Sequence, residues 1–173
     1  LYRLVESGDQ PIISIETASK DLGVVPAFNT IAEIKGIEKP EEYVMLSAHF
    51  DSWDGAQGAT DNGTGTLTMM EAMRILKQVY PNPKRTILVG HWGSEEQGLN
   101  GSRAFVEDHP EIVNKLQALF NQDNGTGRIV NISGQGFKHA GEFITKWLAA
   151  APSNIKDSIK TVFPGAPGGG EIG

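Results

Sequence analysis

The sequence predicts an α/β fold in which a mixed, mostly parallel central sheet lies between two layers of helices. Strand-length segments alternate with helical segments from residue 29 onward, and this alternation favours parallel strand pairs. Residues 86–92 form an apolar run of strand length, as expected for a strand buried on both faces of a sheet. Two earlier strand-like segments joined by a short loop indicate that some pairing is antiparallel.

The first predicted elements are strands. Residues 11–16 are rich in β-branched side chains, which favour extended structure. Residues 29–35 and 43–48 have the same character. The segment between them, 36–42, contains Pro40 and has a suitable length for a hairpin loop. We therefore expect these two strands to form a hairpin.

Helices and strands then alternate. Residues 61–65 predict a turn, and a helix is expected over 66–79, ended by Pro81. Four apolar residues recur in this helix at helical spacing and are expected to pack in the core: Leu67, Met70, Met73 and Leu76. The remaining predicted elements are a strand over 86–92, short helices over 102–107 and 110–114, a strand over 118–121 and a helix over 140–151.

Composition restricts the classes of function. A chain of 173 residues is long enough for one core, so a single domain is expected. The net charge of −6 argues against nucleic acid as a partner. No apolar run approaches the roughly 20 residues that span a bilayer, which argues against membrane insertion. The chain has no cysteine, so any metal ion must be held by His, Asp and Glu side chains.

His49 is the first candidate metal ligand, because it follows the predicted strand 43–48. Residues two apart in an extended chain share a face, so Asp51 lies on the same side. Its carboxylate is placed to orient the imidazole, a support that zinc-binding histidines commonly have. The alternative interpretation is a structural or surface histidine.

Asp61 is the second candidate, at a turn that enters the predicted helix 66–79. The surrounding sequence, GATDNGTG at 58–65, is dense in glycine, which permits close backbone approach around this side chain. A carboxylate here could bridge two cations, one oxygen to each. The alternative interpretation makes Asp61 an ordinary helix N-cap.

Glu95 and Glu96 follow the apolar strand 86–92 as a pair of adjacent carboxylates. Neighbouring residues in an extended segment face opposite ways, so the two can have different roles. One could bind a metal ion while the other removes a proton from a metal-activated water. A surface loop is the alternative.

Asp123 is the last candidate and follows the predicted strand 118–121. It completes a set of acidic residues and one histidine that lie at strand ends or at a helix start. This set suggests a metal cluster.

These residues together resemble the co-catalytic zinc exopeptidases, a family that includes bacterial leucyl aminopeptidases, aminopeptidase Y and plasma glutamate carboxypeptidase. The stretch SAHFDSWDGAQGATDNG at 47–63 is most similar to the carboxypeptidase Q branch. The sequence EEQG at 95–98 and then Asp123 follow in that family's order and approximate spacing. The resemblance covers 29–123 well and implies the zinc exopeptidase (phosphorylase/hydrolase-like) fold.

Carried over position by position, the resemblance implies two zinc ions. Asp61 would bridge them, His49 and Asp123 would complete one metal position, and Glu96 would serve the other. The implied catalytic residues are Glu95, as general base, and Asp51, as the partner of His49. A cis peptide bond after Asp61 is also implied.

The sequence departs from the family in one place. Relatives supply a last histidine ligand from a Gly-Ser-Asp-His-like segment, whereas this chain reaches the glycine-rich stretch 168–173 without one. His109 and His139 are interpreted as surface groups, and His91 as part of a strand. Residues 1–173 are therefore expected to be part of a catalytic domain whose N-terminal segment, inserted domain and C-terminal end are missing.

The leading functional hypothesis is metal-dependent hydrolysis of terminal peptide bonds by an aminopeptidase, dipeptidase or carboxypeptidase. A water activated by two zinc ions would be deprotonated by Glu95 and would attack the peptide carbonyl. The alternatives are a non-catalytic metal-binding or scaffold relative, an inactive fragment, and a glutaminyl cyclase. The expected partner is a peptide substrate, and no oligomeric state is indicated. The resemblance implies a secreted or periplasmic location.

Overall fold

Two parallel strands form the centre of the main sheet. The computed structural model describes residues 1–165, and its four-stranded sheet has the order β1-β3-β2-β4. The strands are β1 (Thr30–Ile34), β2 (Lys39–His49), β3 (Arg85–Trp92) and β4 (Leu116–Asn121). β2 is parallel to both β3 and β4, whereas β1 is antiparallel to β3. The mixed, mostly parallel sheet predicted from the sequence is confirmed.

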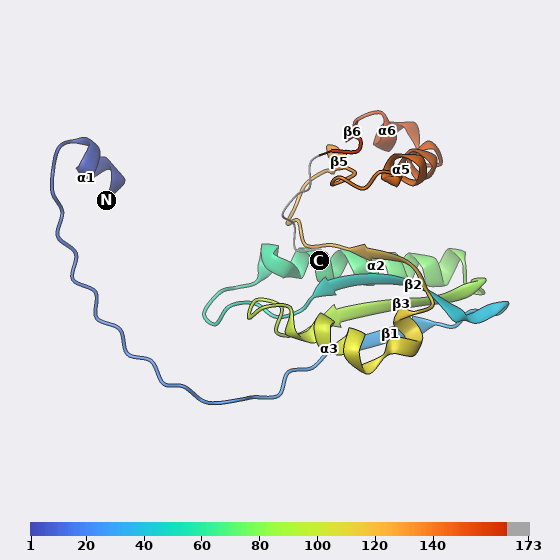
Figure 1. Cartoon of the computed structure of the whole chain (residues 1–173), viewed down its shortest axis with the longest axis horizontal. Coiled ribbons are helices and arrows are strands. Elements are labelled where there is room, and N and C mark those ends of the chain that lie inside the picture. The colour runs from blue at the N-terminus through green and yellow to red at the C-terminus, as the bar shows by residue number, and fades with distance from the viewer. Residues whose placement is uncertain (166–173) are drawn as a thin grey trace.

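Alternate side chains of β2 and β3 build an apolar core on each face of the sheet. On one face Met45, Leu88 and Trp92 pack against Phe105 of α3 (Asn100–Asp108). The short helix α4 (Pro110–Val113) follows α3 and packs against the same face of the sheet through Ile112. On the opposite face the core consists of Leu46, Ala48 and Val89 with Met69 of α2 (Thr64–Val79). The sheet thus lies between helices, and Figure 1 shows α2 running alongside it.

The inward face of α2 differs from the expected one. Leu67 is 66% exposed and Met70 is 54% exposed, so neither packs in the core. The residues that face the sheet are Met69, Ala72, Met73 and Leu76. The sequence contains two overlapping apolar stripes, and helical spacing alone does not distinguish them. The rotation of the helix is fixed at its start, where Gly65 and Thr66 are buried against the strand ends.

The predicted hairpin between the first two sheet strands is wrong, because β3 lies between β1 and β2. After β1 the chain crosses the start of β3 at Gly36, where an added Cβ would lie 2.6 Å from the backbone of Arg85 and Thr86. The Thr86 hydroxyl accepts from the Gly36 amide at 3.1 Å and donates to the Pro40 carbonyl at 2.7 Å. A short connection therefore joins two strands that are not neighbours.

The strand predicted over 11–16 is also wrong. Residues 9–29 have no helix or strand, and Figure 1 shows them as an extended arm that leads from α1 (Tyr2–Glu6) to the sheet. Ile12 is 98% exposed and Ile15 is 79% exposed. β-branched residues favour extended backbone, but a strand also requires a hydrogen-bonded neighbour. Within residues 1–165 this segment has none.

A small unit follows β4. It contains β5 (Asn131–Ser133), α5 (Ala140–Ala149), α6 (Ser153–Lys156) and β6 (Lys160–Val162), and β5 pairs with β6 in parallel. The predicted helix 140–151 is confirmed as α5, whereas the other three elements are too short for a periodic pattern to reveal. The glycine-rich stretch 168–173 lies outside the described residues. Among residues 1–165, no helix combines the length and hydropathy needed to cross a membrane.

We predict that Phe105→Ala lowers the free energy of unfolding by about 3–5 kcal/mol, as is typical for deletion of a buried aromatic ring. Phe105 is 6% exposed, and its ring centroid lies 5.2 Å from that of Trp92. The measurement is urea unfolding followed by circular dichroism. Phe143→Ala is the matched control, because Phe143 is 57% exposed, and it should cost less than about 1 kcal/mol. Equal losses for both variants would contradict this description of the core.

Candidate metal centre

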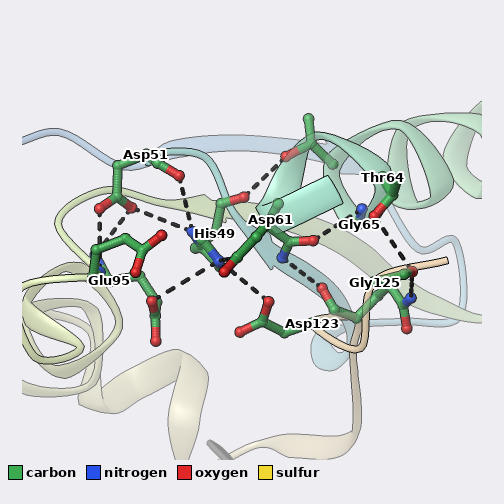
Figure 2. Close-up of polar contacts among 12 residues, drawn as sticks. His49, Asp51, Asp61, Thr64, Gly65, Glu95, Asp123 and Gly125 are labelled. Atoms are coloured by element: carbon green, nitrogen blue, oxygen red, sulfur yellow. Dashed lines mark hydrogen bonds and ion pairs between the residues drawn. The ribbon is translucent and has the colours of Figure 1, made fainter. Parts of the chain in front are cut away.

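His49 is the last residue of β2, and its imidazole ring lies at the centre of the site (Figure 2). The residue is 2% exposed, and its carbonyl accepts from the Thr66 hydroxyl at 3.0 Å. Nδ1 lies 3.1 Å from the backbone carbonyl oxygen of Asp51. Because a carbonyl oxygen only accepts, Nδ1 carries the proton in this contact. In the neutral ring the lone pair of Nε2 is therefore available to a metal ion.

Three carboxylates surround Nε2 of His49. Asp61 Oδ1 lies 2.9 Å from this nitrogen and Asp123 Oδ1 lies 3.2 Å from it. Glu95 Oε2 is 3.9 Å away. Asp61 belongs to η1 (Ala59–Gly63), the turn that precedes α2, while Asp123 follows β4 and Glu95 follows β3. Three separate segments thus deliver acidic groups to one imidazole (Figure 2).

Two sets of ligand atoms in residues 1–165 are close enough to hold a metal ion. One set comes from His49, Glu95 and Asp123, and the other from His49, Asp61 and Glu96. Within each set the ligand atoms lie within 4.8 Å of one another. The structure therefore brings together all the residues that the sequence analysis nominated as metal ligands. The grouping is different, however, since the resemblance assigned Asp123 to a position shared with Asp61.

Asp51 holds the loop that carries Glu95 and Glu96. Its Oδ1 accepts a hydrogen bond from the Glu95 amide at 3.0 Å, and its Oδ2 accepts one from the Glu96 amide at 3.2 Å. Its Oδ1 is 3.6 Å from Nδ1 of His49, farther than its own carbonyl oxygen. We expected the carboxylate to orient the imidazole. In the structure the backbone carbonyl makes the closer contact, and the carboxylate binds the loop.

Asn29 closes the same loop from its other end. The side-chain amide donates to the Gly101 carbonyl at 2.8 Å and accepts from the Gly93 amide at 3.1 Å. The Gly101 amide donates to the Gly93 carbonyl at 3.0 Å. A Cβ on Gly101 would lie 2.3 Å from that carbonyl oxygen, so glycine is required there. These contacts tie together the two ends of the segment that presents the glutamates.

The electrostatics of the site favour positive charge on the imidazole of His49. Burial opposes protonation of the ring, but the charges of Asp123, Asp61 and Glu95 outweigh it. The pKa of His49 therefore lies above its ordinary value. Carboxylates gathered at this density stabilise a cation, and both a proton and a divalent metal ion meet that requirement.

Asp61 is not the N-cap of α2, which was the alternative interpretation. Its carboxylate faces His49, and the acceptor at the helix start is Asn62, whose Oδ1 receives the Gly65 amide at 3.0 Å. The peptide bond between Asp61 and Asn62 is cis, as the resemblance implied. Asn62 was not among the site residues expected from the sequence. An asparagine at the start of a helix is itself a capping signal, and it could have identified this residue.

The other histidines lie outside both ligand sets. His109 contacts Glu111 at 3.3 Å and His139 contacts Glu142 at 3.2 Å, with side chains 46% and 73% exposed. His91 is 7% exposed on β3, and neither of its ring nitrogens has a hydrogen-bond partner in residues 1–165. Burial lowers the pKa of His91. Its placement in a strand agrees with the sequence interpretation.

A cavity of about 420 Å³ adjoins the site. Its polar lining includes His49, Glu95 and Asp123. Most of the remaining wall is apolar, with contributions from Met45, Trp92, Phe105, Leu116 and Leu119. Residues from three strands and α3 form this wall, so no single sequence motif indicated it.

The chain is similar to several known peptidases. Carboxypeptidase Q from Rattus norvegicus is 38% identical over 126 residues, which are 73% of this chain and 27% of the relative. A peptidase M28 precursor from Shewanella amazonensis has a similar structure, with a TM-score of 0.69 and 29% identity over 83% of this chain and 32% of that one. A zinc aminopeptidase from Bacillus subtilis has a TM-score of 0.50 and 36% identity over 55% of this chain and 23% of that one.

The chain spans about a quarter of the length of the curated relatives that it matches. The match to the family nevertheless extends over most of this chain. The model of peptidase family M28 matches residues 29–168, a region that contains the four-stranded sheet and every candidate site residue. The chain therefore belongs to peptidase family M28.

Proposed function

We propose that this chain forms the metal-binding part of a zinc-dependent exopeptidase that hydrolyses terminal peptide bonds. The observation that carries the proposal is the convergence of one buried imidazole with four carboxylates, from Asp61, Glu95, Glu96 and Asp123, at the carboxyl ends of parallel strands. Family M28 membership and the similarity to a zinc aminopeptidase support it. Coverage of only 27% of rat carboxypeptidase Q supports the view that residues 1–173 are one part of a catalytic domain. A secreted or periplasmic location is part of the same proposal.

The donor set fits zinc. Imidazole nitrogen and carboxylate oxygen are ordinary zinc ligands, and a catalytic zinc site typically has three protein ligands with one position open. Together the two ligand sets supply His49, Asp61, Glu96 and Asp123 as candidate ligands, with Glu95 beside them. In the proposed arrangement His49, Asp61 and Asp123 would hold one ion, and Asp61 and Glu96 would hold the other. When bound, zinc supplies Lewis acidity, which makes a water molecule more acidic and polarises a carbonyl oxygen.

Glu95 is the proposed general base. Its side chain is 13% exposed and lies among the ligands, and Asp51 fixes the backbone of its loop. A carboxylate in this position can accept a proton from water and pass it to the nitrogen of the scissile bond. The leaving group then departs as a neutral amine. Its adjacent residue, Glu96, remains available as a ligand. The apolar cavity beside these groups supplies a surface on which a peptide side chain can be oriented.

We predict that the chain binds at least one equivalent of Zn²⁺ at neutral pH. His49→Ala should weaken binding by more than about 100-fold, since loss of an outer partner of a ligand alone costs about 10–100-fold. Equilibrium dialysis with elemental analysis gives the stoichiometry and affinity. His139→Ala, at a side chain 73% exposed, is the matched control and should bind as the wild type does. Equal binding by both variants would exclude His49 as a ligand.

We predict that Glu95→Gln lowers the rate of hydrolysis of dipeptides and amino-acid anilides by about 10²–10⁴-fold while zinc stays bound. The glutamine amide preserves the shape of the glutamate side chain but does not take up a proton at neutral pH. Turnover and zinc content are measured on the same samples. Glu111→Gln, at a side chain 65% exposed, is the control. Full turnover by a zinc-loaded Glu95→Gln variant would show that Glu95 is not the base.

We predict that zinc affinity and the stability of the metal-free chain respond to pH in opposite directions through His49. Zinc needs the neutral ring, so affinity should rise as pH rises through the raised pKa of His49. In the metal-free chain, protonated His49 is stabilised by its carboxylates. That contribution is complete below the ordinary value of about 6.5 and is lost as pH rises through the higher folded-state pKa.

The test compares dialysis and thermal unfolding from about pH 5.5 to about pH 8.5, roughly one unit below to two units above the ordinary pKa of histidine. Subtracting the unfolding data of His49→Asn from those of the wild type isolates this residue from His91, whose lowered pKa acts with the opposite sign. A difference curve that is flat, or that rises with pH, would refute the predicted electrostatic role.

A further inference from the structure

We propose that Asn62 is a positioning residue that sets the separation between the loops carrying Asp61 and Asp123. The inference rests on the proposed metal site and adds a residue that has no role in the preceding account of binding or catalysis. Asn62 follows Asp61 in the chain, and it bonds to the backbone of Gln122, the residue before Asp123. One side chain thus links the immediate neighbours of two carboxylates that are far apart in sequence.

Both ends of the Asn62 side-chain amide are engaged. Nδ2 donates to the carbonyl oxygen of Gln122 at 2.8 Å, and Oδ1 accepts from the Gly65 amide at 3.0 Å. The residue is 2% exposed, so water does not replace either bond easily. An amide suits this place because it offers a donor and an acceptor together, which a carboxylate does not.

The junction around Asn62 leaves little space for adjustment. A Cβ on Gly65 would lie 2.3 Å from Asn62 Oδ1 and 2.4 Å from the Gln122 carbonyl oxygen. The start of α2, the turn η1 and the end of β4 therefore meet with backbone nearly in contact. In such a close-packed junction a shift of Asn62 moves its neighbours rather than being absorbed. Any displacement would reach Asp61, which precedes Asn62, and Asp123, which follows its partner Gln122.

The contacts of the two aspartates show what this junction positions. Asp61 Oδ1 and Asp123 Oδ1 lie 2.9 Å and 3.2 Å from the same nitrogen of His49. Figure 2 shows the two carboxylates approaching His49 from different segments, with Gly65 and Gly125 to their right. A second link between the loops, from the Thr64 hydroxyl to the Gly125 carbonyl, is longer at 3.4 Å. Asn62 therefore provides the shorter connection.

The experiment compares Asn62→Ala and Asn62→Asp with the wild-type chain. Alanine removes both hydrogen bonds without adding charge, whereas aspartate keeps the shape and the acceptor but loses the donor to Gln122. The matched controls are Asn114→Ala and Asn114→Asp, because Asn114 is exposed at the end of α4, away from both loops. Each protein is titrated with Zn²⁺ and with Co²⁺, and deuterium uptake is measured without metal.

We expect both Asn62 variants to bind Zn²⁺ about 10–100-fold more weakly, the usual cost of losing support behind a ligand. At saturating Co²⁺ their visible absorption bands should differ from those of the wild type, because the bands depend on coordination geometry. A role in overall stability alone would lower the melting temperature but leave these bands unchanged. Without metal, deuterium uptake should rise in segments 58–66 and 120–126 and stay constant in 93–101.

Several results would overturn the inference. One is wild-type zinc affinity and cobalt spectra in folded Asn62 variants. Another is global unfolding of both variants, which would assign Asn62 to the fold as a whole. If the wild-type chain itself binds no metal, the proposed function fails, and the deuterium uptake of 58–66 and 120–126 decides the role of Asn62 separately. Deuterium uptake in the Asn62 variants equal to that of the wild type would then refute the proposal.

Discussion

The candidate site depends on a backbone that holds several acidic side chains close to one buried imidazole. Asp61, Asp123 and Glu95 all lie within 4 Å of Nε2 of His49. Like charges at such distances disfavour one another unless a cation lies between them, and burial of the ring strengthens the interaction. Protonation of His49 offsets this repulsion in the metal-free chain, but the carboxylates do not belong to either apolar core. Rigid backbone must therefore hold the carboxylates in place, and the parallel strands supply it, because the carboxyl ends of β2, β3 and β4 meet along one edge.

The support behind each carboxylate is made of ordinary hydrogen bonds rather than of charge. Asp51 binds the amides of Glu95 and Glu96, and Asn29 ties Gly93 to Gly101 beneath them. On the other side of His49, the buried amide of Asn62 connects the turn to the end of β4. The acidic groups are therefore fixed through their main chain, and their carboxylate oxygens are directed toward the centre.

Sequence reasoning identified the elements whose signals are local. The apolar run that became β3 and the helix that became α2 are recognisable because one periodic pattern fills the whole element. The nominated site residues converge because residues at the ends of parallel strands share an edge. The hairpin failed because pairing between β1 and β3 is non-local, and Gly36 allows a crossing that no turn motif announces. Leu67 and Met70 were misplaced because the rotation of α2 depends on contacts at Gly65. Asn62 was missed because its partner, Gln122, is distant in sequence.

The extended arm has a consequence for the size of the functional unit. Within residues 1–165 the first side-chain hydrogen bonds between the arm and the site loop are those of Asn29 to Gly93 and Gly101. The match to family M28 begins at the same residue. Asn29 is therefore the residue at which the extended arm joins the folded domain. Cleavage of the arm before Asn29 would leave the carboxylates around His49 and their hydrogen-bonded supports intact. Removal of Asn29 itself would release the loop that presents the two glutamates.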